Sequence, residues 1–348
     1  MSENQLGRSR IGKLTSPVWS TLSRLTLVLA VSSLLWSAVD SRISCPRCVL
    51  NRCRHHSRRD RLYLNCSRTT YWLFSIREIC YGYRVLDLTC GDTSHLVKLT
   101  RPLVHPACSQ RVTAVRMAKC RENFLTEVSM GNLVSLHALT LEYNRMMRLP
   151  PIVHQLPVTK LTIGGNPLPY LCPGDLPPSL NYLKVTNTKL RLIFRLTLAA
   201  TPHLTSLFLA QNTELTCIHK HAFRELTQLT RLDLQGTKVR SLAALADLVT
   251  PENSKDETLP IVKARSLLVP CDCLFDALGS HFGTKLSSRC RNGLLFEDGP
   301  MNLRKDFSTC VKTPIECGAG DEVEEVMCAN VTSRAYRTGG WGGGGGGG

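Results

Sequence analysis

The sequence predicts an α/β solenoid in which short parallel strands form one concave sheet and irregular segments form the convex side. A nine-residue pattern recurs with apolar residues at its first, fourth and sixth positions and usually Asn at its ninth. It occurs at 112–120, 136–144, 158–166, 180–188, 204–212 and 229–237. Successive sixth positions, from Met117 to Leu234, lie 24, 22, 22, 24 and 25 residues apart, and an earlier unit surrounds Leu88. Six ordered units at so narrow a period indicate a repeat architecture.

The spacing L-x-x-L-x-L-x-x-N is that of the leucine-rich repeat. Apolar residues at alternating positions give each unit a short strand with one apolar side, which only a stacked neighbour can bury. The side chains expected inside are Leu139, Leu141, Leu161, Ile163, Leu207, Leu209, Leu232 and Leu234. The ninth-position Asn is expected to turn inward and bond backbone groups; Cys120, Thr188 and Thr237 replace it in three units.

The chain divides by composition into five segments. Residues 1–41 resemble a signal peptide, with a basic lead, an apolar run at 25–39 and a cleavage point near Ser41. An uncleaved anchor is the alternative, although the run is shorter than the ~20 residues that a membrane span needs. We expect an N-terminal cysteine cap at 42–79, about seven repeats at 80–255, a C-terminal cysteine cap at 256–315, and an acidic, Gly-rich tail at 316–348. The mature chain has no expected span, and an anchor missing from its C-terminus is a further alternative.

All 16 cysteines follow residue 44. After a signal peptide they indicate disulfides rather than metal sites; C-P-R-C at 45–48 has zinc-ligand spacing, but no second such pair follows. Equivalent places in adjacent units predict that Cys80 bonds Cys108 and that Cys90 bonds Cys120. Cys172 and Cys217 lie two units apart, or ~10 Å, and are expected to be free thiols.

Two cysteine groups flank the repeats. Cys45, Cys48, Cys53 and Cys66 precede them, and Cys271, Cys273, Cys290 and Cys310 follow in a C-x-C arrangement with an amphipathic helix expected at 274–282. This plan resembles the capped extracellular leucine-rich-repeat proteins, which include slit-type guidance ligands, small leucine-rich proteoglycans and Toll-type receptor ectodomains. The resemblance implies the pairs Cys45–Cys53, Cys48–Cys66, Cys271–Cys290 and Cys273–Cys310. It also implies a protein-binding scaffold outside the cell.

The expected binding residues lie beside the inward apolar pairs, on the concave face. They are Arg116, Glu142, Lys160, Tyr182, Lys184, Phe208, Arg231 and Asp233. Basic and acidic residues nearly balance there, so we expect a face close to neutral. Tyr182 and Phe208 are its aromatic residues, a type that often carries interface energy. The expected partner is an extracellular protein ligand or receptor.

The formal charge of +16 concentrates in residues 42–68, which hold eight arginines. For a secreted chain this favours a sulfated glycosaminoglycan over nucleic acid, through Arg52, Arg54, Arg58, Arg59 and Arg61. A solvated basic cap and a matrix component held by polyanions are the alternatives. Asn65 and Asn330 occupy glycosylation sequons. No catalytic or nucleotide-binding motif is present, so neither an enzyme nor a cofactor is expected.

Overall fold

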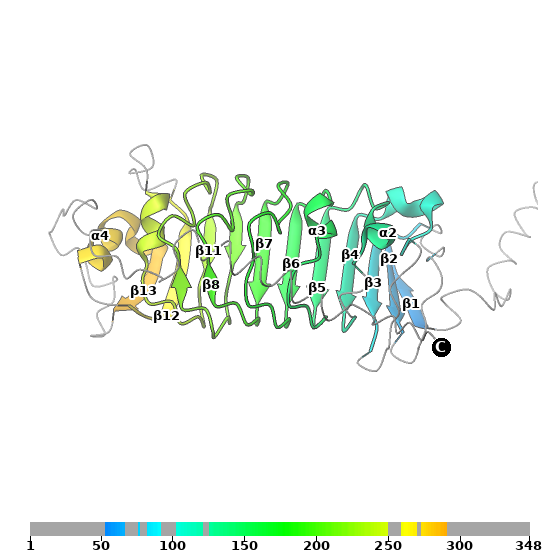
Figure 1. The fold of residues 1–348 in the computed structure, drawn as a ribbon, viewed down its shortest axis with the longest axis horizontal. Coiled ribbons are helices and arrows are strands. Elements are labelled where there is room, and N and C mark those ends of the chain that lie inside the picture. Colours follow the sequence, from blue (N-terminus) through cyan, green and yellow to red (C-terminus); the bar gives the residue numbers. More distant parts are fainter. Residues whose placement is uncertain are drawn as a thin grey trace, which may run out of the picture. The chain divides into compact units, whose positions relative to one another are not determined.

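A computed structural model describes residues 53–66, 76, 82–91, 102–120, 125–249, 259–269 and 273–290 (Figure 1). The chain divides into two compact units, Met1–Arg47 and Cys48–Gly348. The first unit, with the expected signal peptide, lies outside the described residues. All that follows concerns the second unit.

In the described residues of the second unit, one sheet contains 11 strands. In spatial order its strands are β1 (Arg54–Arg58), β2 (Arg61–Asn65), β3 (Val85–Thr89), β4 (Ala114–Ala118), β5 (Ala138–Glu142), β6 (Lys160–Gly164), β7 (Tyr182–Thr186), β9 (Ser206–Phe208), β11 (Arg231–Asp233), β12 (Ile261–Val269) and β13 (Leu286–Cys290). From β2 onward each neighbour is parallel, and β1 alone runs antiparallel to β2. The predicted repeat units supply one strand each, which confirms the parallel solenoid.

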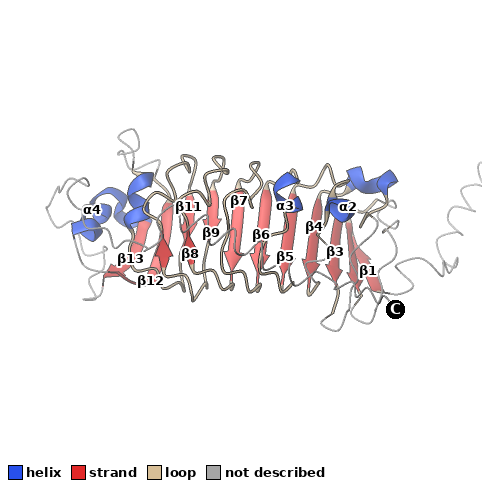
Figure 2. Cartoon of the chain, viewed as in Figure 1, coloured by secondary structure: helices blue, strands red, loops and turns tan. Residues whose placement is uncertain are grey.

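The connections between strands are mostly loops, as Figure 2 shows. The short helices are α2 (Glu127–Met130), α3 (Ile152–Gln155), α4 (Cys273–Phe282) and the 3-10 helices η3 (Pro106–Arg111), η5 (Ala243–Leu248) and η6 (Gly283–Lys285). A second, two-stranded parallel sheet joins β8 (Leu192–Ile193) to β10 (Cys217–Ile218). The amphipathic helix expected at 274–282 is confirmed as α4, in which Leu278 and Phe282 are fully buried.

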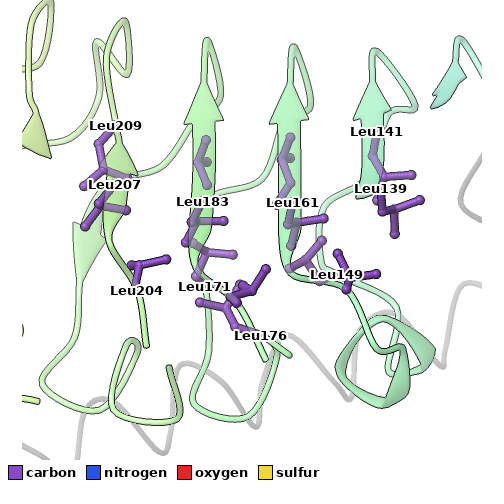
Figure 3. Packing of buried hydrophobic residues seen from close by; sticks show 14 of the residues in the cluster. Leu139, Leu141, Leu149, Leu161, Leu171, Leu176, Leu183, Leu204, Leu207 and Leu209 are labelled. Carbon is purple, nitrogen blue, oxygen red and sulfur yellow. The ribbon is translucent and has the colours of Figure 1, made fainter. Parts of the chain in front are cut away.

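The core lies behind the long sheet and follows the repeat (Figure 3). Each of the eight side chains expected inside, from Leu139 to Leu234, is at most 1% exposed. Burial of each Leu or Ile side chain stabilises the fold by about 1.5–3 kcal/mol. Because the strands are stacked, these side chains form one continuous hydrophobic core.

The ninth-position residues hold the turns together, as predicted. Asn144 Oδ1 accepts the backbone N–H of Cys120 at 2.8 Å, and Asn166 Oδ1 accepts that of Asn144 at 2.8 Å. The amide nitrogens donate back to carbonyls, for example from Asn166 Nδ2 to Leu141 O at 3.0 Å. Both side chains are 1% exposed, so each bond satisfies a group that water cannot reach.

The residue before each ninth position has a positive φ, which the sequence analysis did not predict. These residues are Lys119 (54°), Tyr143 (54°), Gly165 (61°), Asn187 (54°), Gln211 (61°) and Gly236 (72°). A left-handed residue therefore follows each of these strands within one to three residues and turns the chain away from the sheet. Gly165 has a further constraint, since a Cβ there would lie 2.3 Å from atoms of the Tyr143 ring.

The N-terminal cap begins with a β-hairpin, and this corrects the cysteine pairing implied by the resemblance. Cys53 bonds Cys66, with a Cα–Cα distance of 4.4 Å, so the implied pairs Cys45–Cys53 and Cys48–Cys66 are wrong. The reason is the register: Arg54 lies opposite Asn65, which places the cysteines just outside β1 and β2 opposite each other. Cys45 and Cys48 lie outside the described residues, and the disulfide excludes a zinc site using Cys53 and Cys66.

The remaining cysteine predictions have mixed outcomes. The predicted Cys90–Cys120 bond is confirmed, with a Cα–Cα distance of 5.0 Å. Cys108 is disulfide-bonded, whereas Cys80 lies outside the described residues. The expectation that Cys172 and Cys217 are free thiols is wrong, because both are disulfide-bonded. The expectation used the spacing of strands, but Cys172 lies in an irregular segment whose distances that spacing does not set.

The C-terminal cap is described only in part. Cys273 begins α4 and Cys290 ends β13, while Cys271 and Cys310 lie outside the described residues. The two pairings implied there stay predictions. The nine-residue strand β12 was not predicted, and it extends the sheet past the last repeat.

Candidate protein-binding face

The long sheet has one face on the core and one toward solvent, which we call the outer face. Register aligns its side chains in rows that run across the strands. The middle row contains Asp87, Arg116, Thr140, Thr162, Lys184, Phe208, Asp233 and Lys263. The eight residues predicted to bind protein all lie on this face; their role in binding stays a prediction.

A network of ion pairs occupies the outer face of β2 to β5. Arg116 Nη1 lies 3.0 Å from Asp87 Oδ1, and Arg116 Nη2 lies 2.6 Å from Glu142 Oε2. Arg61 Nη1 approaches Asp87 Oδ2 at 3.9 Å. Burial disfavours the charge of Arg116, but its hydrogen bonds to Glu142 and Asp87 raise the pKa of the guanidinium. These four charges satisfy one another, so this end of the face is close to neutral.

A different group occupies β6 to β12, which we call the cationic–aromatic patch. It consists of Lys160, Tyr182, Lys184, Phe208, Arg231 and Lys263. The Tyr182 and Phe208 ring centres lie 5.2 Å apart at an interplanar angle of 39°. Lys160 Nζ lies 4.6 Å from the centre of the Tyr182 ring. The tilted pair and the cation over it are favourable contacts that hold the rings in place while both stay partly exposed.

The charge on the patch is positive. Lys184, Arg231 and Lys263 form no ion pair with any residue in the described part of the chain. Asp233, the carboxylate among them, accepts the backbone N–H of Gln235 at 3.0 Å. The prediction of a nearly neutral face therefore describes only part of the sheet. Positive and negative charges pair on β2 to β5, whereas basic residues predominate on β6 to β12. Lys263 was missed because it belongs to β12, and Ile261 at the start of that strand is 52% exposed beside Arg231.

Four of the five predicted polyanion-binding residues lie on the hairpin. Arg54 and Arg58 are exposed in β1, and Arg59 is exposed in the two-residue turn with φ 56°. Arg61 differs, because it lies beside Asp87 and its guanidinium carbon is 5.7 Å from the centre of the Tyr63 ring. Arg52 and the sequon residue Asn330 lie outside the described residues. Asn65 is exposed at the end of β2.

The described residues contain neither a candidate metal site nor a candidate membrane-spanning helix. No three or more His, Cys, Asp or Glu side chains there are grouped so that they could hold a metal ion. None of the helices in the described ranges is both long enough and apolar enough to cross a membrane.

Parts of this chain are similar to known proteins. Residues 178–239 match the leucine rich repeat family. Similar solved structures include the leucine-rich repeat domain of the type III effector XCV3220 (XopL), with 24% identity and a TM-score of 0.37 over 53% of this chain and 67% of that one. They also include the Drosophila Toll–Spatzle complex, with 14% identity and a TM-score of 0.44 over 61% of this chain and 30% of that one. No curated protein matches the sequence.

The family match and the parallel sheet together define the fold as a leucine-rich-repeat solenoid. Such a domain indicates a protein-binding role, since stacked strands present an extended surface.

Proposed function

We propose that this chain is an extracellular protein-recognition module that binds a protein ligand or receptor through the outer face of its sheet. The observation that carries the proposal is the Tyr182–Phe208 pair, held on the exposed face among basic residues that outnumber the one carboxylate beside them, Asp233. Trp, Tyr and Arg are the residue types that most often supply the binding energy of protein interfaces. The paired charges on β2 to β5 would lie at the rim of that contact.

The composition of the patch specifies the chemistry of the partner. A contact on Tyr182 and Phe208 needs an apolar or aromatic side chain, and the surrounding cations favour carboxylates around it. The proposed partner is therefore a folded extracellular protein with an acidic surface and an apolar anchor. Burial already raises the pKa of the Tyr182 phenol, so its ring remains neutral when such a partner covers it.

An extracellular location has separate support. The disulfides Cys53–Cys66 and Cys90–Cys120 are typical of an oxidising compartment, and residues 1–41 resemble a signal peptide. Within this proposal, a secreted ligand, a matrix component and the ectodomain of a membrane receptor would use the same face. No catalytic role is proposed.

The proposal predicts that Tyr182→Thr with Phe208→Thr lowers the affinity for the partner roughly 30-fold, because the two rings form the apolar centre of the contact. The chain would be used to probe an array of receptor and secreted ectodomains, and each protein it binds would be titrated by interferometry. Val128→Thr with Val134→Thr is the matched control, since these side chains are 49% and 61% exposed but belong to α2 and the segment after it. An array without a binder, or a partner that loses no affinity, would contradict the proposal.

A second candidate function is binding of a sulfated glycosaminoglycan by the hairpin. The observation that favours it is the exposure of Arg54, Arg58 and Arg59 on one short hairpin that a disulfide closes. Closely spaced guanidinium groups can contact several sulfates along one polyanion, and each contact weakens with salt.

For this second function we expect Arg58→Gln with Arg59→Asn to elute from heparin at clearly lower salt than the parent chain. Asn is chosen because it tolerates the positive φ of Arg59. Lys238→Gln with Arg240→Gln removes two exposed charges elsewhere on the repeats and should elute close to the parent. If the two variants elute together, the hairpin is only one part of a diffuse positive surface.

A further inference from the structure

The first strand of the sheet has a free edge. β1 is the end strand in the order of the sheet, and all five of its residues are exposed (Figure 1). No other strand in the described part of the chain pairs with its outer side. A strand with an unpaired edge is a template onto which another strand can add.

The hairpin geometry identifies which backbone groups the edge offers. A two-residue turn makes Arg58 and Arg61 a hydrogen-bonded pair, and such pairs then alternate along the hairpin with pairs that are not bonded. His55–Leu64 and Ser57–Leu62 are therefore the pairs without mutual bonds. The Cα atoms of Cys53 and Cys66 lie 4.4 Å apart, which agrees with this alternation. In the alternation Cys53–Cys66 is a pair without mutual backbone hydrogen bonds, and the Cα atoms of such pairs lie about 4.5 Å apart.

It follows that the N–H and C=O groups of His55 and Ser57 point away from β2. Neither residue bonds to any partner through these groups in the described part of the structure. Two residues at alternate positions, each with a free donor and a free acceptor, form the array that one more β-strand needs.

The side chains of β1 determine what kind of strand can add. Arg54, His56 and Arg58 lie on the outer face, opposite Asn65, Tyr63 and Arg61. His56 is fixed there by stacking on Tyr63, with ring centres 4.3 Å apart and planes at 7°. A second copy of β1 would place its own arginines beside these, and like charges on neighbouring strands are destabilising. An acidic strand would place carboxylates beside the same arginines.

We infer that the free edge of β1 binds an extended acidic segment of a partner protein by antiparallel strand addition. The segment carries acidic residues at alternate positions, which face Arg54, His56 and Arg58 on the outer face. The intervening residues lie opposite His55 and Ser57 and exchange backbone hydrogen bonds with them. This site differs from the cationic–aromatic patch, because it recognises the backbone as well as the charge.

The inference can be tested with a labelled peptide, TEVEVET, and the full chain, by fluorescence anisotropy. In the proposed register the valine N–H groups point toward β1 and those of the glutamates point away. N-methylation of both valines should weaken binding roughly 30-fold, whereas N-methylation of the two glutamates that follow a valine should change it less than about threefold. Equal affinity of the two methylated peptides, or no binding of the parent peptide, would overturn the inference.

A protein variant tests the charge requirement. Arg54→Glu with Arg58→Glu should weaken binding of the peptide about tenfold or more at low salt, and Lys238→Glu with Arg240→Glu should leave it nearly unchanged. Peptide binding that survives the first variant would overturn the inference. So would a dimer of the parent chain that the peptide cannot dissociate, since a second copy would then occupy the edge.

Discussion

Replacing Asn212 with Ala should lower the free energy of unfolding by about 3–5 kcal/mol, measured by urea denaturation followed by circular dichroism. Asn212 Oδ1 accepts from the N–H of Thr188 at 2.9 Å and from its hydroxyl at 2.7 Å. Its Nδ2 donates to Val185 O and Leu209 O, both at 2.8 Å. The side chain is fully buried, so its loss leaves several backbone groups without a partner or water.

Two further variants make this expectation specific. Asn181→Ala should cost less than about 0.5 kcal/mol, because the Asn181 side chain is exposed and forms no hydrogen bond with a described residue. Asn212→Thr should lower the free energy of unfolding by an intermediate amount, because a Thr hydroxyl can still donate a hydrogen bond. Thr237, at the equivalent position of the next unit, donates to Leu234 O at 2.8 Å. Equal losses for Asn212→Ala and Asn181→Ala would show that the Asn ladder does not stabilise the stack.

The repeats could be predicted because their structure is local and periodic. Alternation within each unit identified the buried side of β5, β6, β9 and β11, including Leu139 and Leu232, which are at most 1% exposed. The ninth-position Asn could be assigned to the interior because a polar residue at a fixed place after a buried strand needs backbone partners. The same periodic logic identified Cys90 and Cys120 as neighbours on adjacent units.

The caps could not be predicted in the same way. The pairing of Cys53 with Cys66 follows from the register of a hairpin whose exposed strand, Arg54–Arg58, has no apolar alternation to reveal it. β12 follows an interval at 250–258 that breaks the period, so no unit boundary indicated a strand there. Positive φ values at Lys119 and Tyr143 were hidden because most residues at that position are not glycine.

The candidate site was predictable in its membership but not in its electrostatics. Alternation placed Arg116, Glu142 and Lys184 on the solvent side correctly. The ion pairs that Arg116 forms with Asp87 and Glu142 depend on the register between strands of neighbouring units, and a count of charges does not capture that register. The aligned sequence units nevertheless contain this information. Asp87 and Arg116 occupy the same position in neighbouring units, and Glu142 lies in the next unit, two residues further along its strand. Matching opposite charges between neighbouring units would have shown that the acidic and basic residues pair on β2 to β5, whereas the basic residues of β6 to β12 have few acidic neighbours.

Removing the Cys90–Cys120 disulfide should have the second large effect. Replacing both residues with Ala should lower the free energy of unfolding by about 3.5 kcal/mol, the chain-entropy value for a loop of this size, and Cys53→Ala with Cys66→Ala by about 3 kcal/mol. The loops close over 30 and 13 residues, respectively. Denaturation of each variant beside the parent chain measures both values.

The disulfide variant should lose stability mainly in one part of the sheet, and this is the more demanding test of the prediction. The disulfide joins the ends of β3 and β4, and each unit of a solenoid contacts mainly its neighbours. Removal of the disulfide should therefore increase the rate of amide hydrogen exchange much more in β2 to β4 than in β6 to β11. The Cys53–Cys66 variant should raise exchange mainly in the hairpin. Faster exchange spread evenly from β2 to β11 would contradict this prediction, because it would mean that the sheet opens as one cooperative unit.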